Sequence, residues 1–449
     1  MAAIDRSVYK QFDIISADGS NLVDITGGIV AFSYFENLFS PMVTAQAIVT
    51  NTGQTLPDGE GGYTSLYNGL PLRGGERVNI KIQKNSGNNV DLEFTEINGN
   101  EMYVASITNV NIDAERESFV LNLVSREAIS NETSRVGKKF PTSQKISDSV
   151  RDIIKEYLLS DKGVFVDETE NPYGFIGNMK KPFTILTWLA SKSVPANVAG
   201  QSSSAGYFFF ETKEGFQFKS IDSLIASAPF KQEYTYTPNV VNQQDADVDF
   251  KILKYSTNRN QDLINNLERG SYCTYRMYYN PLDSTFTSPQ QGLFKLSDYV
   301  ERVENLGSDF SINLPPVDKK GKSLGDIPSR FMTGVLDYGT IERKDKNSLK
   351  KNADPMEYQS QAMMRYNILH TVELIMTIPL NSLLSAGDLI KCKFGKVSIS
   401  KDKTIDDEQS GLYMIKEVVH YFESKGSYSK LKLVRDTFGK KSKWLKIIY

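Results

Sequence analysis

The chain has 449 residues, with 52 Lys and Arg against 54 Asp and Glu, and its formal net charge is -2. This near balance argues against a general nucleic-acid binder, because such proteins need a basic surface to displace counterions from phosphates. Only two Cys and two His occur, which argues against a disulfide framework or a thiolate zinc site and excludes an HExxH metalloprotease motif.

Residues 1–130 alternate apolar and polar side chains as β-strands do, and we expect them to form a first β domain. Strands are expected at residues 8–15, 22–25, 29–39, 42–50 and 78–83, followed by a hairpin of residues 102–112 and 119–124. The excursion Gly53–Gly75 is rich in glycine and too long for a hairpin loop. The loop at residues 55–75 is therefore predicted to project from the domain or to contact a partner protein.

Residues 131–230 change character and predict a small α+β module. Helices are expected at 147–159 and 182–193, because apolar residues recur there at helical spacing and Pro182 suits a first turn. An aromatic strand at 206–211, with a hairpin partner at 215–218, completes this module.

Residues 231–300 return to β character and predict a second β domain. It carries one helix at 260–269, which Gly270 ends, and a Tyr-rich strand at 272–279. Residues 301–353 are polar and predict a linker or insertion.

The last segment, residues 354–449, predicts a C-terminal β-rich domain with a basic tail. Asp354 and Pro355 form a good start for a helix that runs to about residue 369. Strands are expected at residues 371–378, 389–394, 412–422 and 431–434. The whole pattern therefore predicts a mainly β (α+β) fold.

Fragments that resemble sites of known chemistry lack required residues. Gly321-Lys322-Ser323 ends like a phosphate-binding loop, but Pro316 stands where the first glycine is required. The segment Ser202–Ser204 lacks the G-x-S-x-G frame of an esterase and is expected to be a flexible connector.

Three aspartates, Asp245, Asp247 and Asp249, begin like a calcium loop. The glycine position of that loop holds Phe250 and the bidentate position holds Ser256, so the motif fails. The period of two predicts one exposed strand face instead. We expect no metal or other cofactor.

The two histidines are predicted to be structural. His420 lies in an alternating strand, where a half-buried residue bonded to a neighbouring loop is the expected role, although a general base is the alternative. His370 ends a Met- and Tyr-rich helix, where it would interact favourably with the negative end of the helix dipole. Met1–Lys10 has no signal-peptide pattern, and no stretch approaches the ~18 apolar residues that span a bilayer.

Three segments in the last hundred residues carry a family resemblance: Thr377–Asn381, Leu384–Ile390 and Ser410–His420. In this order they resemble the C-terminal part of baseplate central hub proteins of T-even-type contractile-tail bacteriophages. The region from Gly28 to Ala45 is similar to the opening hairpin of such hubs, and the helices at 147–159 and 182–193 are similar to their middle module. The loop at 55–75, the linker at 301–350 and the tail depart from the family, so their roles stay open.

This resemblance implies a structural protein without catalytic activity. It implies two tube-type antiparallel β-barrel or sandwich domains per chain, at 1–130 and 231–300, and a homotrimer that forms a pseudo-sixfold ring. Such a ring joins the tail tube protein to the central spike or tail lysozyme protein and to baseplate wedge proteins, and DNA only passes through it. The implied location is the virion tail, after assembly in the host cytoplasm.

Two other functions remain open from the residues alone. One is a tail-associated cell-wall hydrolase, which only the abundance of carboxylates favours. The other is a glycan-binding module that uses Tyr-rich faces, provided that Tyr272 and Tyr278 are exposed.

The C-terminal tail, residues 440–449, is a candidate partner-docking segment. Its basic residues surround apolar ones, and the alternative is a frayed basic end. The candidate docking residues are Lys440, Lys441, Lys443, Trp444 and Lys446.

Overall fold

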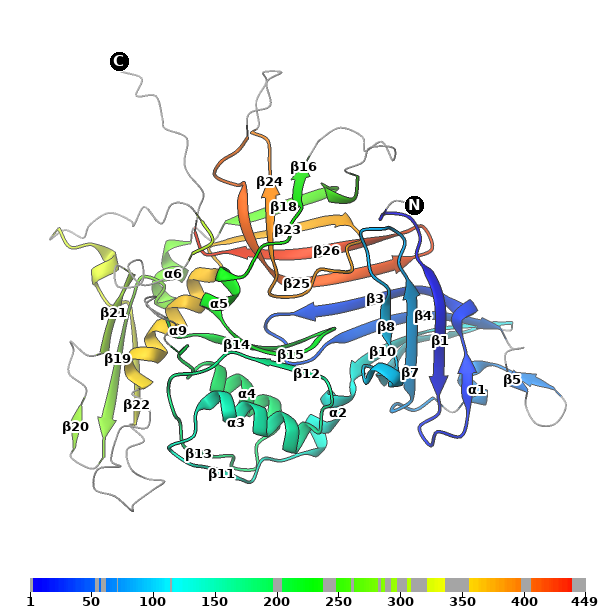
Figure 1. Cartoon of the computed structure of the whole chain (residues 1–449), viewed down its shortest axis with the longest axis horizontal. Coiled ribbons are helices and arrows are strands. Elements are labelled where there is room, and N and C mark those ends of the chain that lie inside the picture. The colour runs from blue at the N-terminus through cyan, green and yellow to red at the C-terminus, as the bar shows by residue number, and fades with distance from the viewer. Residues whose placement is uncertain are drawn as a thin grey trace.

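The chain is mainly β, as the sequence predicts, and fifteen strands form one continuous sheet that curls into two lobes. Strands β3 and β25 run side by side where the lobes meet (Figure 1). No helix in the described part of the chain is long and apolar enough to cross a membrane. This computed structural model describes residues 3–52, 56–57, 62–70, 72–113, 115–196, 204–236, 248–259, 262–281, 284–286, 292–296, 305–307, 321–335, 355–396 and 405–437.

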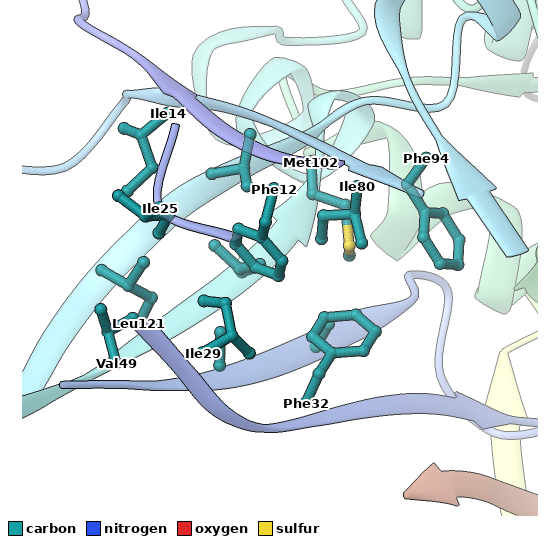
Figure 2. Close-up of a cluster of buried hydrophobic side chains, with 14 of the residues drawn as sticks. Phe12, Ile14, Ile25, Ile29, Phe32, Val49, Ile80, Phe94, Met102 and Leu121 are labelled. Atoms are coloured by element: carbon teal, nitrogen blue, oxygen red, sulfur yellow. The ribbon is translucent and has the colours of Figure 1, made fainter. Parts of the chain in front are cut away.

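The first lobe is built from the N-terminal strands. They are β1 (Val8–Ile15), β2 (Leu22–Asp24), β3 (Ile29–Asn37), β4 (Thr44–Thr52), β7 (Arg77–Gln83), β8 (Leu92–Phe94), β9 (Met102–Ile112) and β10 (Arg116–Ser125). Alternate side chains of these strands point inward, as a period of two requires. Figure 2 shows Phe12, Phe32, Ile80 and Leu121 meeting in this core, and all four are fully buried.

The glycine-rich excursion leaves this lobe as a short hairpin and a helical turn. The hairpin pairs β5 (Leu56–Pro57) with β6 (Tyr63–Thr64), and α1 (Leu66–Gly69) follows. Leu66 returns to the core of the first lobe, where it is fully buried. The described part of the excursion is thus anchored at its C-terminal end, while Tyr63 is 67% exposed.

The second lobe combines strands from two separate segments. They are β16 (Glu233–Tyr236), β17 (Lys251–Ile252), β18 (Lys254–Arg259), β23 (Val372–Pro379), β24 (Leu389–Lys393), β25 (Gly411–Glu423) and β26 (Gly426–Arg435). Their inward residues form a separate apolar core. The second lobe therefore takes strands from both of the segments that the sequence separates, 231–300 and 354–449, because β18 pairs with β23 across a long insertion.

The α+β module follows the first lobe. Its elements are α2 (Arg126–Thr133), β11 (Lys139–Phe140), α3 (Ile146–Ile153), a π-helical turn (Ile154–Leu158), β12 (Gly163–Val166), β13 (Phe175–Ile176), α4 (Pro182–Ala190), β14 (Tyr207–Thr212), β15 (Gly215–Ser220) and α5 (Ile221–Ala226). Helices α3 and α4 lie on one side of the β12–β15–β14 sheet (Figure 1). Apolar side chains from both layers form one cluster.

The insertion between β18 and β23 forms a small sheet covered by a helix. Its elements are α6 (Leu263–Arg269), β19 (Cys273–Asn280), β20 (Thr285–Phe286), β21 (Leu293–Lys295), β22 (Arg330–Val335) and α9 (Pro355–Leu369). Strand β22 falls within the expected linker at 301–353 and pairs in parallel with β19. Gly270 ends α6 with φ of 74°, as predicted, and Asp262 caps its first turn.

The two lobes have the same strand order along the chain and within the sheet. In chain order, β1, β2, β3, β4, β7, β9 and β10 correspond to β16, β17, β18, β23, β24, β25 and β26. One difference is that β16 runs parallel to β24, whereas β1 runs antiparallel to β7. The fold is therefore a structural duplication, although the sequence shows no convincing repeat.

Candidate functional site: the junction between the two lobes

The lobes are joined edge to edge by antiparallel pairing of β3 with β25. The pairing runs from Asn37 opposite Glu417 to Ala31 opposite Glu423. Aromatic rings meet across it on the core side, since the rings of Tyr34 and His420 lie nearly parallel with centroids 6.3 Å apart. One sheet thus continues through both lobes in the order β9–β10–β4–β3–β25–β26–β23–β18.

His420 sits fully buried at the centre of this junction. Its Nδ1 lies 2.9 Å from Ser429 Oγ, and its Nε2 lies 3.4 Å from the Leu384 carbonyl oxygen. Because Ser429 Oγ also accepts the Asn381 N–H, its hydroxyl proton is available to Nδ1, and Nε2–H then donates to Leu384. Burial, with the Lys213 ammonium nearby, lowers the pKa of His420 to about 3. The predicted contact with a neighbouring loop is confirmed, although the residue is fully rather than half buried.

The loop between β23 and β24 fastens three parts of the molecule together. Its Ala386 N–H donates to Glu36 of the first lobe at 2.9 Å. The Lys213 ammonium of the α+β module donates to the carbonyl oxygens of Ser382 and Leu384. The loop and the start of β24 contain Leu384–Ile390, which is one of the three segments that carry the family resemblance. These contacts give that segment a structural role in joining the parts of the molecule.

Glu36 is the buried acid of the junction. Its carboxylate also accepts the Tyr34 hydroxyl at 3.0 Å and the Lys213 backbone N–H at 2.8 Å. Burial raises the pKa of Glu36 and lowers that of the Lys213 side chain, because each charged form loses hydration. The strand pattern offered a signal for this residue, since Phe32, Tyr34 and Glu36 share the inward face.

A second buried ion cluster ties the module to the first lobe. The Lys162 ammonium lies 2.8 Å from Glu127 and 2.7 Å from Glu211. Glu211 also accepts the Val43 N–H at 2.9 Å and the Ser125 hydroxyl at 2.8 Å. Burial raises the pKa of Glu211. Burial also acts on Glu127, but the Lys162 charge together with the hydrogen bonds from Lys162 and Ser160 outweighs it, so the pKa of Glu127 is lowered.

A polar cavity of about 500 Å³ lies beside the end of β18 and includes the second histidine. His370 Nδ1 is 2.9 Å from Glu373, and the Lys416 ammonium is 3.2 Å from the same carboxylate. Burial lowers the pKa of His370. The described residues contain no group of three or more His, Cys, Asp or Glu placed to hold a metal ion.

Other residues singled out in the sequence fall in different places. Asp249 lies in a 3-10 turn rather than on a strand face, and it accepts the Ala3 N–H at 2.8 Å; the expected strand was wrong because the chain turns there into β17. Tyr278 is only 6% exposed, so the exposure that a glycan-binding Tyr face requires is not met there. Residues 202–203, 245, 247 and 316 lie outside the described residues, as do Lys440, Lys441, Lys443, Trp444 and Lys446.

Comparison with known proteins finds similarity in structure only. No family model and no curated protein matches the chain. A tail protein from Neisseria meningitidis MC58 aligns with a TM-score of 0.52 and 8% identity, covering 95% of this chain and 96% of that one. The 43 kDa tail protein of prophage MuSo2 from Shewanella oneidensis also aligns with a TM-score of 0.52, at 9% identity over 95% and 98% of the chains.

The chain shares the fold of these phage tail proteins. This agreement is consistent with the resemblance to contractile-tail baseplate hubs and confirms the mainly β fold class. A component of the Escherichia coli type VI secretion system, described as similar to T4 bacteriophage tail proteins, aligns with a TM-score of 0.43 at 9% identity, over 93% of this chain and 76% of that one.

Proposed function

We propose that this chain is the structural hub of a contractile phage tail baseplate, in which three copies form a pseudo-sixfold ring. The ring joins the tail tube to the central spike and to the surrounding baseplate wedge proteins, and the chain has no catalytic role. The observation that carries the proposal is the duplication: two lobes with one strand order are joined edge to edge within a single chain. Two such lobes present two successive positions of a ring, so three chains supply six.

The outward face of the continuous sheet supports a role as the wall of a passage. In the first lobe this face carries uncharged side chains such as Gln46, Thr50 and Asn122. In the second lobe acidic and basic side chains both occur on this face, and Lys432 lies 2.8 Å from Glu417. A face with little net charge holds DNA or protein weakly, which suits a passage more than a binding groove.

Solution mass and assembly partners test the proposal. Light scattering on the purified chain should give three times the chain mass of 50.4 kDa, and averaged electron micrographs should show a ring with apparent sixfold symmetry. Co-expression with the tail tube and spike proteins of the same phage should yield a complex that contains both. A stable monomer at micromolar concentration that captures neither protein contradicts the hub.

A further inference from the structure

Corresponding strands of the two lobes are in the same register. Residues that lie opposite one another on four neighbouring strands form a row across the sheet. The four strands are β3, β4, β10 and β9 in the first lobe and β18, β23, β26 and β25 in the second. In the first lobe the row is Ser33, Gln46, Asn122 and Ser106. In the second lobe it is Ser256, Ile375, Lys432 and Glu417. Each row ends in a strand that has a bulge just before the row: Ala105 precedes Ser106 in β9, and Lys416 precedes Glu417 in β25. Because the bulges fall at equivalent positions, the two rows align without an offset.

Each lobe leaves one edge of this sheet without a partner in the described part of the chain. Strand β18 pairs with β23 on one side only. Strand β9 pairs with β7 only at Met102 and Tyr103, which leaves the stretch Ala105–Ile112 open on that side. In the correspondence between the lobes, β9 is the equivalent of β25 and β18 is the equivalent of β3. The strands β25 and β3 pair with each other at the internal junction.

The open stretch of β9 has the properties of an edge that is covered in the assembly. Ala105–Ile112 contains no charged residue and no proline, although natural proteins usually protect free edges with one or the other. Val110 is 37% exposed and Ile112 is 65% exposed. An unpaired backbone edge with exposed apolar side chains is a template for another strand.

We propose that β18 of one copy adds to β9 of the next copy, antiparallel and in the register of the internal junction. At that junction Phe35 lies opposite Val419. Phe35 is two residues after Ser33, and Val419 is two residues after Glu417. The same steps along the equivalent strands lead from Ser256 to Asn258 and from Ser106 to Thr108, so Asn258 of one copy faces Thr108 of its neighbour.

Both predicted partners are exposed in the single chain and lie on the outward face. The contact joins different edges of the two copies, so it is head-to-tail and produces a closed ring rather than a two-fold dimer when the rotation closes. This inference rests on the proposed ring and adds to it which strands and which residues meet.

Paired cysteines test the register. In antiparallel pairs, opposite Cα atoms are about 4.5–5.5 Å apart, within the roughly 4.4–6.8 Å that a disulfide spans. The variant Thr108→Cys/Asn258→Cys should therefore cross-link under mild oxidation into a covalent trimer that reducing agent dissolves. The native Cys273 and Cys392 are both buried, so the two new thiols carry the cross-link.

The matched control is Thr108→Cys/Lys254→Cys, which moves the second thiol four residues along the same strand, or about 13 Å. It should give little cross-linking, and a mixture of the two single variants Thr108→Cys and Asn258→Cys should give covalent dimers at most. Circular dichroism and thermal melting like those of the wild type establish that each variant is folded.

The outcomes separate the register from the ring. A folded trimer by light scattering in which the matched pair fails to cross-link, or cross-links no better than the control, overturns the inferred register and leaves the hub standing. Covalent chains longer than three copies support the strand pairing and contradict closure at three. A wild-type monomer, with no cross-linking in any variant, overturns both.

Discussion

Replacement of His420 by glutamine should remove part of the acid sensitivity of the fold. His420 is neutral in the folded chain, with its pKa lowered to about 3, whereas an unfolded histidine titrates near about 6.5. A base with a depressed folded pKa contributes fully to stability above its unfolded pKa. That contribution is lost as the pH falls from about 6.5 towards 3, because only the unfolded chain takes up the proton.

The magnitude follows from this difference in pKa. A pH of 5 lies about 1.5 units below the pKa of a histidine in the unfolded chain, and each unit corresponds to about 1.4 kcal/mol. The wild type should therefore lose about 2 kcal/mol of unfolding free energy through this one group. The His420→Gln variant cannot take up the proton, and its amide retains a donor for the Leu384 carbonyl. Other acid effects, such as protonation of Glu127, occur in both proteins and cancel in the comparison.

Urea unfolding at pH 7.5 and pH 5.0, followed by far-UV circular dichroism at one protein concentration, measures this difference. The expected result is that the wild type loses about 2 kcal/mol more than His420→Gln between the two pH values. His370→Gln serves as the control, because this histidine remains partly exposed and should account for a smaller difference. Equal losses in the wild type and His420→Gln would refute the assignment of a buried, neutral His420.

Further predictions concern the buried ions, a glycine and enzymatic activity. Lys162→Met removes the cation that bridges the buried carboxylates of Glu127 and Glu211 and should lower the unfolding free energy by about 3–5 kcal/mol in the same urea assay. Gly387→Ala should lower the melting temperature, because φ is +91° and the new Cβ would lie 3.2 Å from the Phe210 ring; Gly395→Ala, with open space around it, should leave it nearly unchanged. A peptidoglycan zymogram should show no cleared band, and clearing by the purified chain would contradict the structural role.

Local structure was largely predictable from the sequence because it depends on local patterns. Alternation placed the strand at Val8–Ile15 with the bounds that the structure shows, and Pro182 and Gly270 fixed a helix start and a helix end. The helix expected at 147–159 was found, with its second half wound as a π-helical turn. Periodicity carries no information on that change in winding.

The junction could not be predicted in the same way. Pairing of β3 with β25 depends on residues far apart in sequence, and a period of two says which face is buried but not which strand lies alongside. Glu36 on an inward face was a usable signal for a buried polar site, yet its partners Lys213 and Ala386 come from two other segments. The duplication was hidden because equivalent rows hold chemically different residues, such as Asn122 and Lys432.

The pairing of β3 with β25 also has a consequence for biosynthesis. Asn37 and Glu417 are 380 residues apart, so at about 5–20 residues per second the edge of β3 waits roughly 20–75 s on the ribosome for its own partner strand. Throughout that interval the edge of β3 is open to a β25 strand of a newly completed neighbouring chain whose own β3–β25 junction has not yet closed. Such exchange would entangle chains that are made on the same messenger RNA. Slower synthesis, or a chaperone that shields the open edge of β3, would change the yield of entangled chains without altering the folded structure.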